Sequence, residues 1–249
     1  MSNKQPNRDD LGSRMKGYEF VTRNHLSRRS PVIIRIDGRA FHTFTKHIIK
    51  LDESVDTQNP FSDIMHDLMV KTTNALVHEI QGCVLGYTQS DEISLLLKDW
   101  ATYETQAWFD SNISKILSVS ASIATMSFNQ SILQYNNTQL PTDTSLHATA
   151  TFDSRVFNIP PSEVCNYFIW RQQDATRNSV QMLGHHHYSQ KQMNGLSNSQ
   201  VQDKLMSDHQ INWNDLEVWK KRGTCVLPLA VDEDIPIFKQ DRSYVEQYL

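Results

Sequence analysis

The chain has 249 residues, of which 39% are hydrophobic and 21% charged, and its formal net charge is −4. That length and composition suffice for one sizeable core without division into independent domains. The polar N-terminus has no signal-peptide pattern, no apolar run reaches the roughly 20 residues that cross a bilayer, and three scattered cysteines exclude a disulfide framework, so we expect a cytoplasmic protein without a membrane partner.

The N-terminal part of the chain is basic: residues 1–50 contain 11 lysines and arginines against 4 acids. We expect residues 1–13 to be flexible, because they are polar and lack periodicity. Residues 14–29 carry apolar side chains at helical spacing between basic ones, which predicts an amphipathic helix. Such a helix either covers the edge of a sheet or offers positive charge to a polyanion.

A short β-branched run, residues 32–36, follows and ends in Asp37-Gly38. This pattern predicts a buried strand with an aspartate at its exit. Phe41 and Phe44 then anchor a short helix, and the N–H groups of a helix N-terminus can bind phosphate. An ordinary Asp-Gly turn would have the same sequence.

A second acidic stretch lies at the tip of a predicted hairpin. After a helix expected from Asn59-Pro60 to residue 82, two strand-like runs, 84–87 and 93–97, flank a polar segment that contains Asp91. If the two strands are neighbours, Asp37 and Asp91 converge. Carboxylates that close are tolerated mainly around a cation, and Mg²⁺ commonly shares one or two of them with substrate phosphates. A solvated hairpin tip is the alternative.

The remaining pattern completes a mixed fold. A helix over 103–128, a strand over 147–157, helices from 160 and 198, and a strand over 224–230 follow in order. This order predicts an α/β (α+β) protein, a ferredoxin-like palm of the polymerase type with an antiparallel sheet and packed helices. We expect residues 14–157 to form the palm-like core, with residues 158–249 as a helical C-terminal portion of the same domain.

Six motifs occur in a fixed order along the chain: RIDGRAFHTF (35–44), the SDE hairpin (90–92), TQAWF (105–109), FDSRVF (152–157), WRQQDATRNS (170–179) and HQINWN (209–214). The ordered set resembles the tRNA-His guanylyltransferase (Thg1) superfamily, and most closely its Thg1-like proteins, over approximately residues 14–227. Those proteins are 3′-to-5′ nucleotide polymerases that act on tRNA 5′ ends. This sequence departs from the family at Thr176, where the eukaryotic enzymes have the histidine of a His-Ile-Asn-Asn motif. The departure favours the broader Thg1-like repair class.

The resemblance implies a mechanism with two Mg²⁺ ions held by Asp37, Asp91 and the backbone of Gly38. It also makes Glu92 important, although regular strand alternation would turn Glu92 away from Asp91. Residues expected to bind the nucleotide are Gly38, Arg39, Ala40, Phe41, His42, Lys50, Ser90, Asn112 and Lys115. We expect Asp153 to be mainly a structural partner of Arg155.

The implied partners are tRNA, GTP and ATP, in a homotetramer. Residues expected to contact tRNA are Arg23, Arg28, Arg171, Arg177, Asn178 and His187. The run His185–His187 lacks the spacing of a zinc site. We expect template-dependent nucleotide addition that repairs truncated tRNA 5′ ends, with ATP or GTP activating a 5′ monophosphate. The alternatives are a dedicated tRNA-His guanylyltransferase, a palm-type nucleotidyl cyclase, and a catalytically silent tRNA-binding module.

Overall fold

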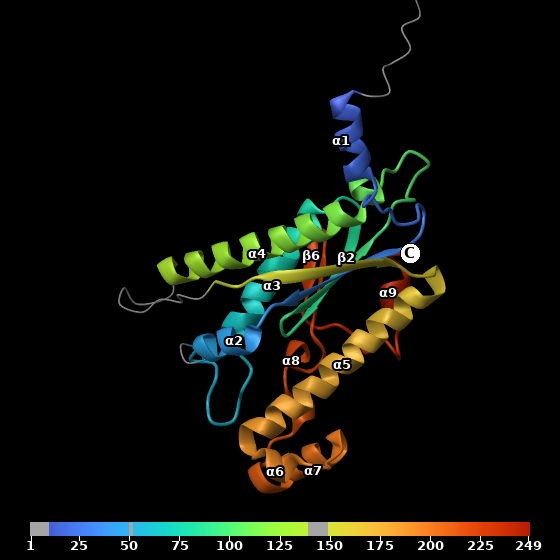
Figure 1. Ribbon diagram of the computed structural model, residues 1–249. Coiled ribbons are helices and arrows are strands. Elements are labelled where there is room, and N and C mark those ends of the chain that lie inside the picture. Colours follow the sequence, from blue (N-terminus) through green and yellow to red (C-terminus); the bar gives the residue numbers. More distant parts are fainter. Residues whose placement is uncertain (1–9, 50–51, 139–148) are drawn as a thin grey trace, which may run out of the picture.

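The computed structural model describes residues 10–49, 52–138 and 149–249, and its centre is a six-stranded antiparallel sheet (Figure 1). The strand order is β4-β1-β3-β2-β5-β6. The strands are β1 (Val32–Gly38), β2 (Cys83–Gln89), β3 (Glu92–Leu97), β4 (Phe152–Asn158), β5 (Thr224–Leu227) and β6 (Ala230–Asp232). The first four strands with their two crossover helices form two interleaved split β-α-β units, so the predicted ferredoxin-like palm is confirmed.

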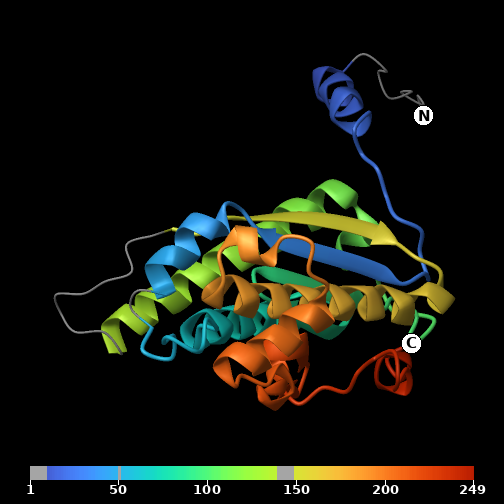
Figure 2. The same ribbon diagram turned by 90° about the horizontal axis from the view of Figure 1, so that it is seen from below.

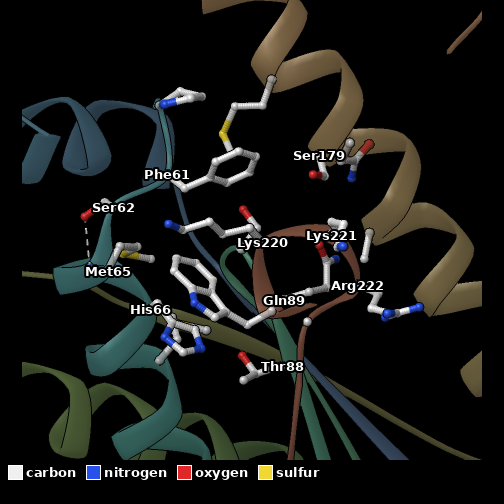
Figure 3. Close-up of a pocket in the computed structure, with 18 of the residues that line it drawn as sticks. Phe61, Ser62, Met65, His66, Thr88, Gln89, Ser179, Lys220, Lys221 and Arg222 are labelled. Atoms are coloured by element: carbon white, nitrogen blue, oxygen red, sulfur yellow. Dashed lines mark hydrogen bonds between the residues drawn. The ribbon is translucent and has the colours of Figure 1, made fainter. Parts of the chain in front are cut away.

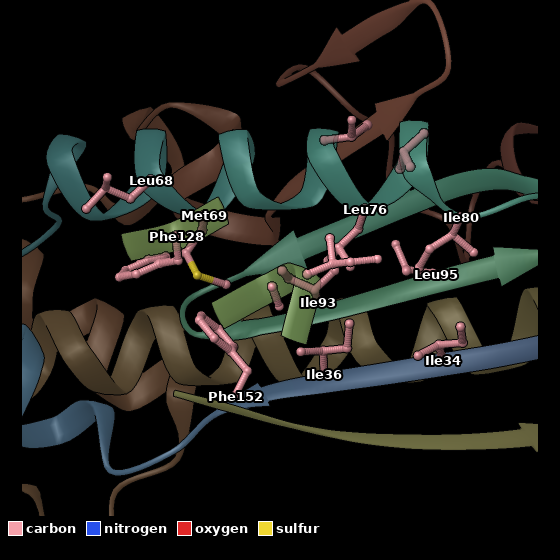
Figure 4. Packing of buried hydrophobic residues seen from close by; sticks show 14 of the residues in the cluster. Ile34, Ile36, Leu68, Met69, Leu76, Ile80, Ile93, Leu95, Phe128 and Phe152 are labelled. Carbon is pink, nitrogen blue, oxygen red and sulfur yellow. The ribbon is translucent and has the colours of Figure 1, made fainter. Parts of the chain in front are cut away.

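Two helices, α3 (Asp63–Glu79) and α4 (Ile113–Thr138), cover one face of the sheet. Their apolar side chains form one cluster with those of β1 and β3, and Figure 4 shows Leu76 of α3 facing Ile93 and Ile36 of the sheet. Helix α3 begins later than Asn59-Pro60 because the Ser62 side chain accepts a hydrogen bond from the Met65 N–H and caps the helix. This layer contains the main hydrophobic core.

Helix α4 begins at Ile113, ten residues after the predicted start, and follows a 3₁₀ turn, η1 (Trp108–Ser111). By length and composition, Ile113–Asn137 is the one described helix that could cross a membrane. Its apolar side chains Ile123 and Phe128 are instead buried in the core against β4 and α3. We therefore interpret α4 as a core helix.

The opposite face of the sheet is covered by α5 (Pro161–His187), a long helix that runs diagonally below the strands in Figure 1. Phe168 of α5 and Phe238 of the C-terminal segment pack against Ile33 and Leu96. The smaller elements are α2 (Phe41–Ile49), α6 (Gln190–Met193), α7 (Asn198–His209), η2 (Trp213–Asp215), α8 (Val218–Arg222) and α9 (Ser243–Glu246). Helices α7 and α8 pack on α5, and β5 then joins the edge of the sheet beside β2.

The N-terminal helix differs from the prediction. Helix α1 spans Leu11–Phe20, so it is shorter than the expected 14–29 segment and starts inside the region expected to be flexible. None of its residues is buried, and it projects away from the rest of the chain (Figures 1 and 2). Of the two roles considered for this segment, covering a sheet edge is wrong for α1, because its apolar residues are too few and too scattered to form one packing face.

Candidate active site

The exit of β1 and the β2–β3 hairpin lie side by side. Asp37 is directly opposite Glu92 in the β1–β3 register, and the Gly38 N–H donates a hydrogen bond of 2.9 Å to the Asp91 carbonyl oxygen. The hairpin turn consists of only two residues, and Ser90 adopts a left-handed conformation with φ 51°. The tight turn thus places Asp91 next to Asp37 although the two lie 54 positions apart in the sequence.

Asp37 is held by two arginines. Its Oδ2 accepts a hydrogen bond of 3.2 Å from Arg35 Nε and lies 3.5 Å from Arg155 Nη1. Its side chain keeps 27% of its accessible surface, so the carboxylate remains open to solvent. Asp153 pairs with Arg155 at 3.8 Å, as predicted, but both side chains are more than half exposed rather than buried. A ligand can therefore reach Asp37 and its arginines.

Asp91 is a carboxyl group in an unfavourable environment. Burial raises its pKa most, and the negative charge of Asp37 raises the pKa further. A cation beside Asp91 would favour its ionised form. The described residues contain no group of three or more His, Cys, Asp or Glu side chains suited to a metal. Two carboxylates with a backbone carbonyl and substrate phosphates nevertheless match the way Mg²⁺ is commonly bound.

Glu92 does not share this environment. It is buried, and its two carboxylate oxygens accept hydrogen bonds from Arg171 Nε at 2.6 Å and Nη2 at 2.7 Å. Arg171 is itself only 4% exposed and also binds Asp174 at 2.9 Å. Two expectations need correction: Arg171 is buried and does not face RNA, and Glu92 is committed to Arg171. Glu92 is better described as a residue that positions the hairpin than as a ligand of a metal or substrate.

The segment after Asp37 turns sharply into α2. A Cβ added at Gly38 would lie 2.3 Å from the Phe41 ring, so only glycine fits beneath that ring. Ala40 has φ 56°, and the Arg39 N–H donates to the Thr151 carbonyl oxygen at 2.8 Å. The N-terminus of α2 thus follows the end of β1 by three residues, and the first N–H groups of a helix have no partner within the helix.

Two expected nucleotide ligands cannot be placed. The side chain of His42 and the whole of Lys50 lie outside the described residues. Their assignments therefore remain predictions.

Asn112 and Lys115 are not at this end of the sheet. The buried Asn112 side chain accepts a hydrogen bond of 3.0 Å from the Lys115 N–H and caps α4. The start of α4 is bonded to the segment before β1, through Ile113 N–H and the Asn24 carbonyl oxygen at 3.0 Å, whereas Asp37 ends β1. Within one chain, the expectation that Asn112 and Lys115 bind the same nucleotide as Asp37 was wrong.

The residues expected to contact RNA are dispersed. Arg23 is exposed beside α1, while Arg28 is paired with Asp110 at 3.0 Å and Asp99 at 3.5 Å. Arg177 is exposed on α5 and forms an ion pair with Asp174.

The histidine run has local partners. His187 Nε2 lies 3.4 Å from the Gln58 carbonyl oxygen, and its ring is tilted by 35° against that of His209 with centroids 4.6 Å apart. His186 Nε2 lies 2.9 Å from the Asp56 carbonyl oxygen. Among the described residues, these histidines do not belong to a group of three or more His, Cys, Asp or Glu side chains that could hold a metal.

A pocket of about 150 Å³ opens beside the hairpin (Figure 3). Ser90 lines it, together with Asn178 of α5 and the start of α3. Its aromatic side is formed by Trp219, whose ring stacks on His66 with centroids 4.0 Å apart and an angle of 14°. Phe61 meets the same ring edge-on at 6.4 Å. Burial lowers the pKa of His66 to about 4, so this imidazole is neutral at pH 7.

Three consecutive cations, Lys220, Lys221 and Arg222, also line this pocket. They are fixed to the sheet at Gly223, where φ is 81° and an added Cβ would lie 2.6 Å from the Thr88 carbonyl oxygen. The Tyr87 hydroxyl donates to the Arg222 carbonyl oxygen at 2.7 Å. The Trp219–Gly223 run was not among the residues expected from the sequence to line the site. An aromatic residue followed by three cations and a glycine was the available signal.

Paired acids at adjacent strand ends of a ferredoxin-like sheet, beside an aromatic and cationic pocket, define the palm class of nucleotidyltransferase. Residues 12–160 match the profile of the Thg1 family, described as tRNAHis guanylyltransferase. The chain belongs to this family.

Solved structures agree with this assignment. A bacterial tRNA(His) guanylyltransferase (Thg1)-like protein in complex with ATP superimposes with a TM-score of 0.86 and 43% identity, covering 96% of this chain and 99% of that one. A bacterial Thg1-like protein in complex with GTP gives a TM-score of 0.76 and 39% identity over the same shares.

Among curated proteins, the probable tRNA(His) guanylyltransferase of Drosophila melanogaster is 28% identical over 210 residues, which is 79% of this chain and 66% of that protein. The chain thus spans just under two thirds of that relative. The uncharacterized protein R259 of Acanthamoeba polyphaga mimivirus is 27% identical over 244 residues, 91% of this chain and 80% of that protein.

Proposed function

We propose that this protein adds nucleotides in the 3′-to-5′ direction to the 5′ end of tRNA, templated by the opposing acceptor strand. The observation that carries this function is the placement of Asp37 and Asp91 side by side at two strand ends. Membership of the Thg1 family supports the substrate class. Because Thr176 replaces a family histidine, we favour repair of truncated 5′ ends over dedicated maturation of tRNA-His.

Asp37, Asp91 and the Gly38 carbonyl would hold two Mg²⁺ ions, which supply positive charge that favours ionisation of a ribose 3′-hydroxyl and neutralises the triphosphate. The hydroxyl oxygen of the incoming nucleotide forms a bond to the activated 5′ phosphorus of the tRNA. The bond from that phosphorus to pyrophosphate or AMP breaks, and the hydroxyl proton passes to solvent. The chain orients these groups and forms no covalent intermediate.

Arg35 and Arg155 have a specific part in this scheme. Both contact Asp37 Oδ2. If Asp37 binds Mg²⁺, the two guanidinium groups can bind phosphoryl oxygens instead. A guanidinium group matches a phosphoryl group in charge and in hydrogen-bonding geometry. A 5′ monophosphate is first activated at the same site: one of its oxygens bonds to the α-phosphorus of ATP or GTP, and pyrophosphate leaves. AMP, or GMP after activation with GTP, is then the group displaced in the addition step.

The pocket beside the hairpin would hold the base and sugar of the nucleoside triphosphate. Trp219 and Phe61 offer apolar surface, and Lys220 to Arg222 offer charge towards phosphates. The bacterial relatives in complex with ATP and GTP support a site for purine nucleotides. We also propose a homotetramer in the cytoplasm; the uncovered apolar side chains of α1, among them Met15 and Tyr18, support association of copies.

One assay tests this function. A tRNA that lacks its first 5′ nucleotide is offered beside full-length tRNA-His, with Mg²⁺ and each nucleoside triphosphate in turn. We expect incorporation of the template-matched nucleotide into the truncated tRNA. A cyclic nucleotide formed without RNA would identify a cyclase instead. Binding of tRNA without release of pyrophosphate or AMP would identify a silent binding module.

A further inference from the structure

A second cavity, of about 410 Å³, lies on the other side of Lys221 and Arg222 from the pocket beside the hairpin. Both residues line both cavities. Helix α5 also contributes residues to both cavities: Asn178 lines the first, and Thr176 and Arg177 line the second. We call this second cavity the α5–α8 cavity. Its volume falls in the range of about 300–1,000 Å³ that is typical of small-molecule sites.

The lining of the α5–α8 cavity is strongly positive. Arg177, Lys221, Arg222 and Lys239 contribute four cationic side chains, and none of the described lining residues is acidic. Among the described residues, Arg177 is the one of the four that forms an ion pair, with Asp174. The cavity therefore concentrates positive charge that the lining itself does not neutralise.

Two of the cations are held in place with hydrogen-bonding capacity to spare. Arg222 Nε is buried and has no hydrogen-bond partner among the described residues. Lys221 Nζ donates to the Asn214 carbonyl oxygen at 2.5 Å. Burial and the nearby charge of Arg222 lower the pKa of Lys221, and the charges of Asp215 and Asp234 oppose this shift without reversing it. An ammonium and a guanidinium at close quarters repel each other, and an anion between them removes that cost.

The rest of the lining is suited to a nucleotide rather than to a simple inorganic ion. Trp213 forms one wall, and its Nε1–H donates to Ser179 Oγ at 3.0 Å, which fixes the ring. Gln173 and Asn214 add amide donors and acceptors. A planar aromatic wall, amides and several cations are the groups that bind a base together with its phosphate.

We propose that the α5–α8 cavity is a second nucleotide-binding site, which accepts one phosphate-bearing nucleotide unit. That unit comes either from an RNA strand or from a free nucleotide, because both present the same base and phosphate. The site goes beyond the proposed addition reaction, since Asp37 and Asp91 do not line it. The shared cations link it to the pocket beside the hairpin, so a strand or nucleotide bound there lies next to the reacting nucleotide.

The test is a binding measurement without Mg²⁺, so that its result is independent of nucleotide addition. Lys239 is exposed and lines the cavity, so Lys239→Glu reverses a charge without disturbing the core. Lys191 is equally exposed but lies outside both cavities, so Lys191→Glu is the matched control. The probes are a fluorescent 12-nucleotide oligoribonucleotide and fluorescent GMP, each titrated at several salt concentrations.

We expect Lys239→Glu to weaken binding of one probe about fivefold or more. The slope of the logarithm of its binding constant against the logarithm of the salt concentration should become shallower by about one, because one phosphate contact is lost. Loss confined to the oligoribonucleotide identifies RNA as the source, and loss of one of two GMP sites identifies a free nucleotide. Lys191→Glu should change either affinity less than twofold. Equal effects of the two variants on both probes, or no effect of Lys239→Glu on either, would overturn the second site.

Discussion

Arg171 forms two parallel hydrogen bonds to Glu92, from Nε at 2.6 Å and from Nη2 at 2.7 Å, across 79 positions of the sequence. Glu92 follows Asp91 directly at the hairpin, so this pair fixes the hairpin to α5. Burial raises the pKa of Glu92 despite the neighbouring Arg171 charge, which means that the pair is costly to desolvate. We interpret it as a clamp that keeps Asp91 opposite the exit of β1.

Arg171→Ala should therefore lower the free energy of unfolding by about 3 kcal/mol, because it leaves the Glu92 carboxylate buried and unpaired. The double variant Glu92→Leu with Arg171→Met should recover most of that loss. Arg177→Ala, which removes the exposed end of the same charge chain, should cost less than about 1 kcal/mol. Urea unfolding of the four proteins measures this, and a wild-type midpoint for Arg171→Ala would contradict the clamp.

Gly223 should be intolerant of any side chain. It has φ 81°, and an added Cβ would lie 2.6 Å from the Thr88 carbonyl oxygen. Gly195 provides the control, with φ 82° and nothing within 4 Å of an added Cβ. Gly195→Ala should cost about 1 kcal/mol from backbone strain, and Gly223→Ala about 3 kcal/mol, because strain and collision add. Equal unfolding midpoints for the two variants would show that the contact with β2 does not matter.

The sequence predicted the parts of the site that depend on local pattern. The β-branched run before Asp37 formed β1, and the polar segment around Asp91 formed the hairpin turn. Pairing of β1 with β3 then followed from the fold class. The helix N-terminus at residue 63 was displaced because capping by Ser62 was not recognised.

Contacts between distant segments could not be predicted in this way. No periodicity indicates that Arg171 binds Glu92, and strand alternation does not say which charged residue will be buried. The approach of Trp219 to His66 depends on how α8 packs after η2, which is a tertiary property. Asn112 was misplaced because a residue that caps α4 and a residue that binds phosphate have the same sequence signal.

His66 should make the protein sensitive to acid. Burial lowers its pKa to about 4, and Glu233, 3.9 Å from Nε2, is too exposed to offset this. A histidine with a depressed folded pKa contributes stability that is complete above the unfolded pKa of about 6.5 and is lost as the pH falls towards 4.

Over that window the wild type should lose about 3 kcal/mol more than His66→Gln, which carries no titrating ring. Urea unfolding between pH 7.5 and pH 4.5 measures the difference. His78 is exposed, so His78→Gln is the control, and its stability should follow the wild-type dependence on pH. Parallel curves for the wild type and His66→Gln would rule out a buried neutral imidazole.

Trp219 should determine nucleotide affinity. Trp219→Leu removes the aromatic surface of the pocket beside the hairpin while leaving Asp37 and Asp91 in place. We expect the KM for the nucleoside triphosphate to rise about tenfold, with kcat changed less than threefold, because binding energy common to ground and transition states is lost. Trp100→Leu, beyond the far end of β3, should leave both constants near wild type. An unchanged KM for Trp219→Leu would exclude this pocket as the base site.

The most direct test compares incorporation of the template-matched nucleotide into 5′-truncated tRNA by Asp37→Asn, Asp91→Asn and Asp153→Asn in the presence of Mg²⁺. Asp153 is the matched control, because it lies opposite Asp37 in the β1–β4 register and, among the described residues, its ion-pair partner is Arg155. If Asp37 and Asp91 are paired metal ligands, the first two variants should stay folded and their incorporation rates should fall at least about a hundredfold. The rate of Asp153→Asn should stay within about fivefold of the wild-type rate. A wild-type rate in Asp37→Asn or Asp91→Asn would contradict the account.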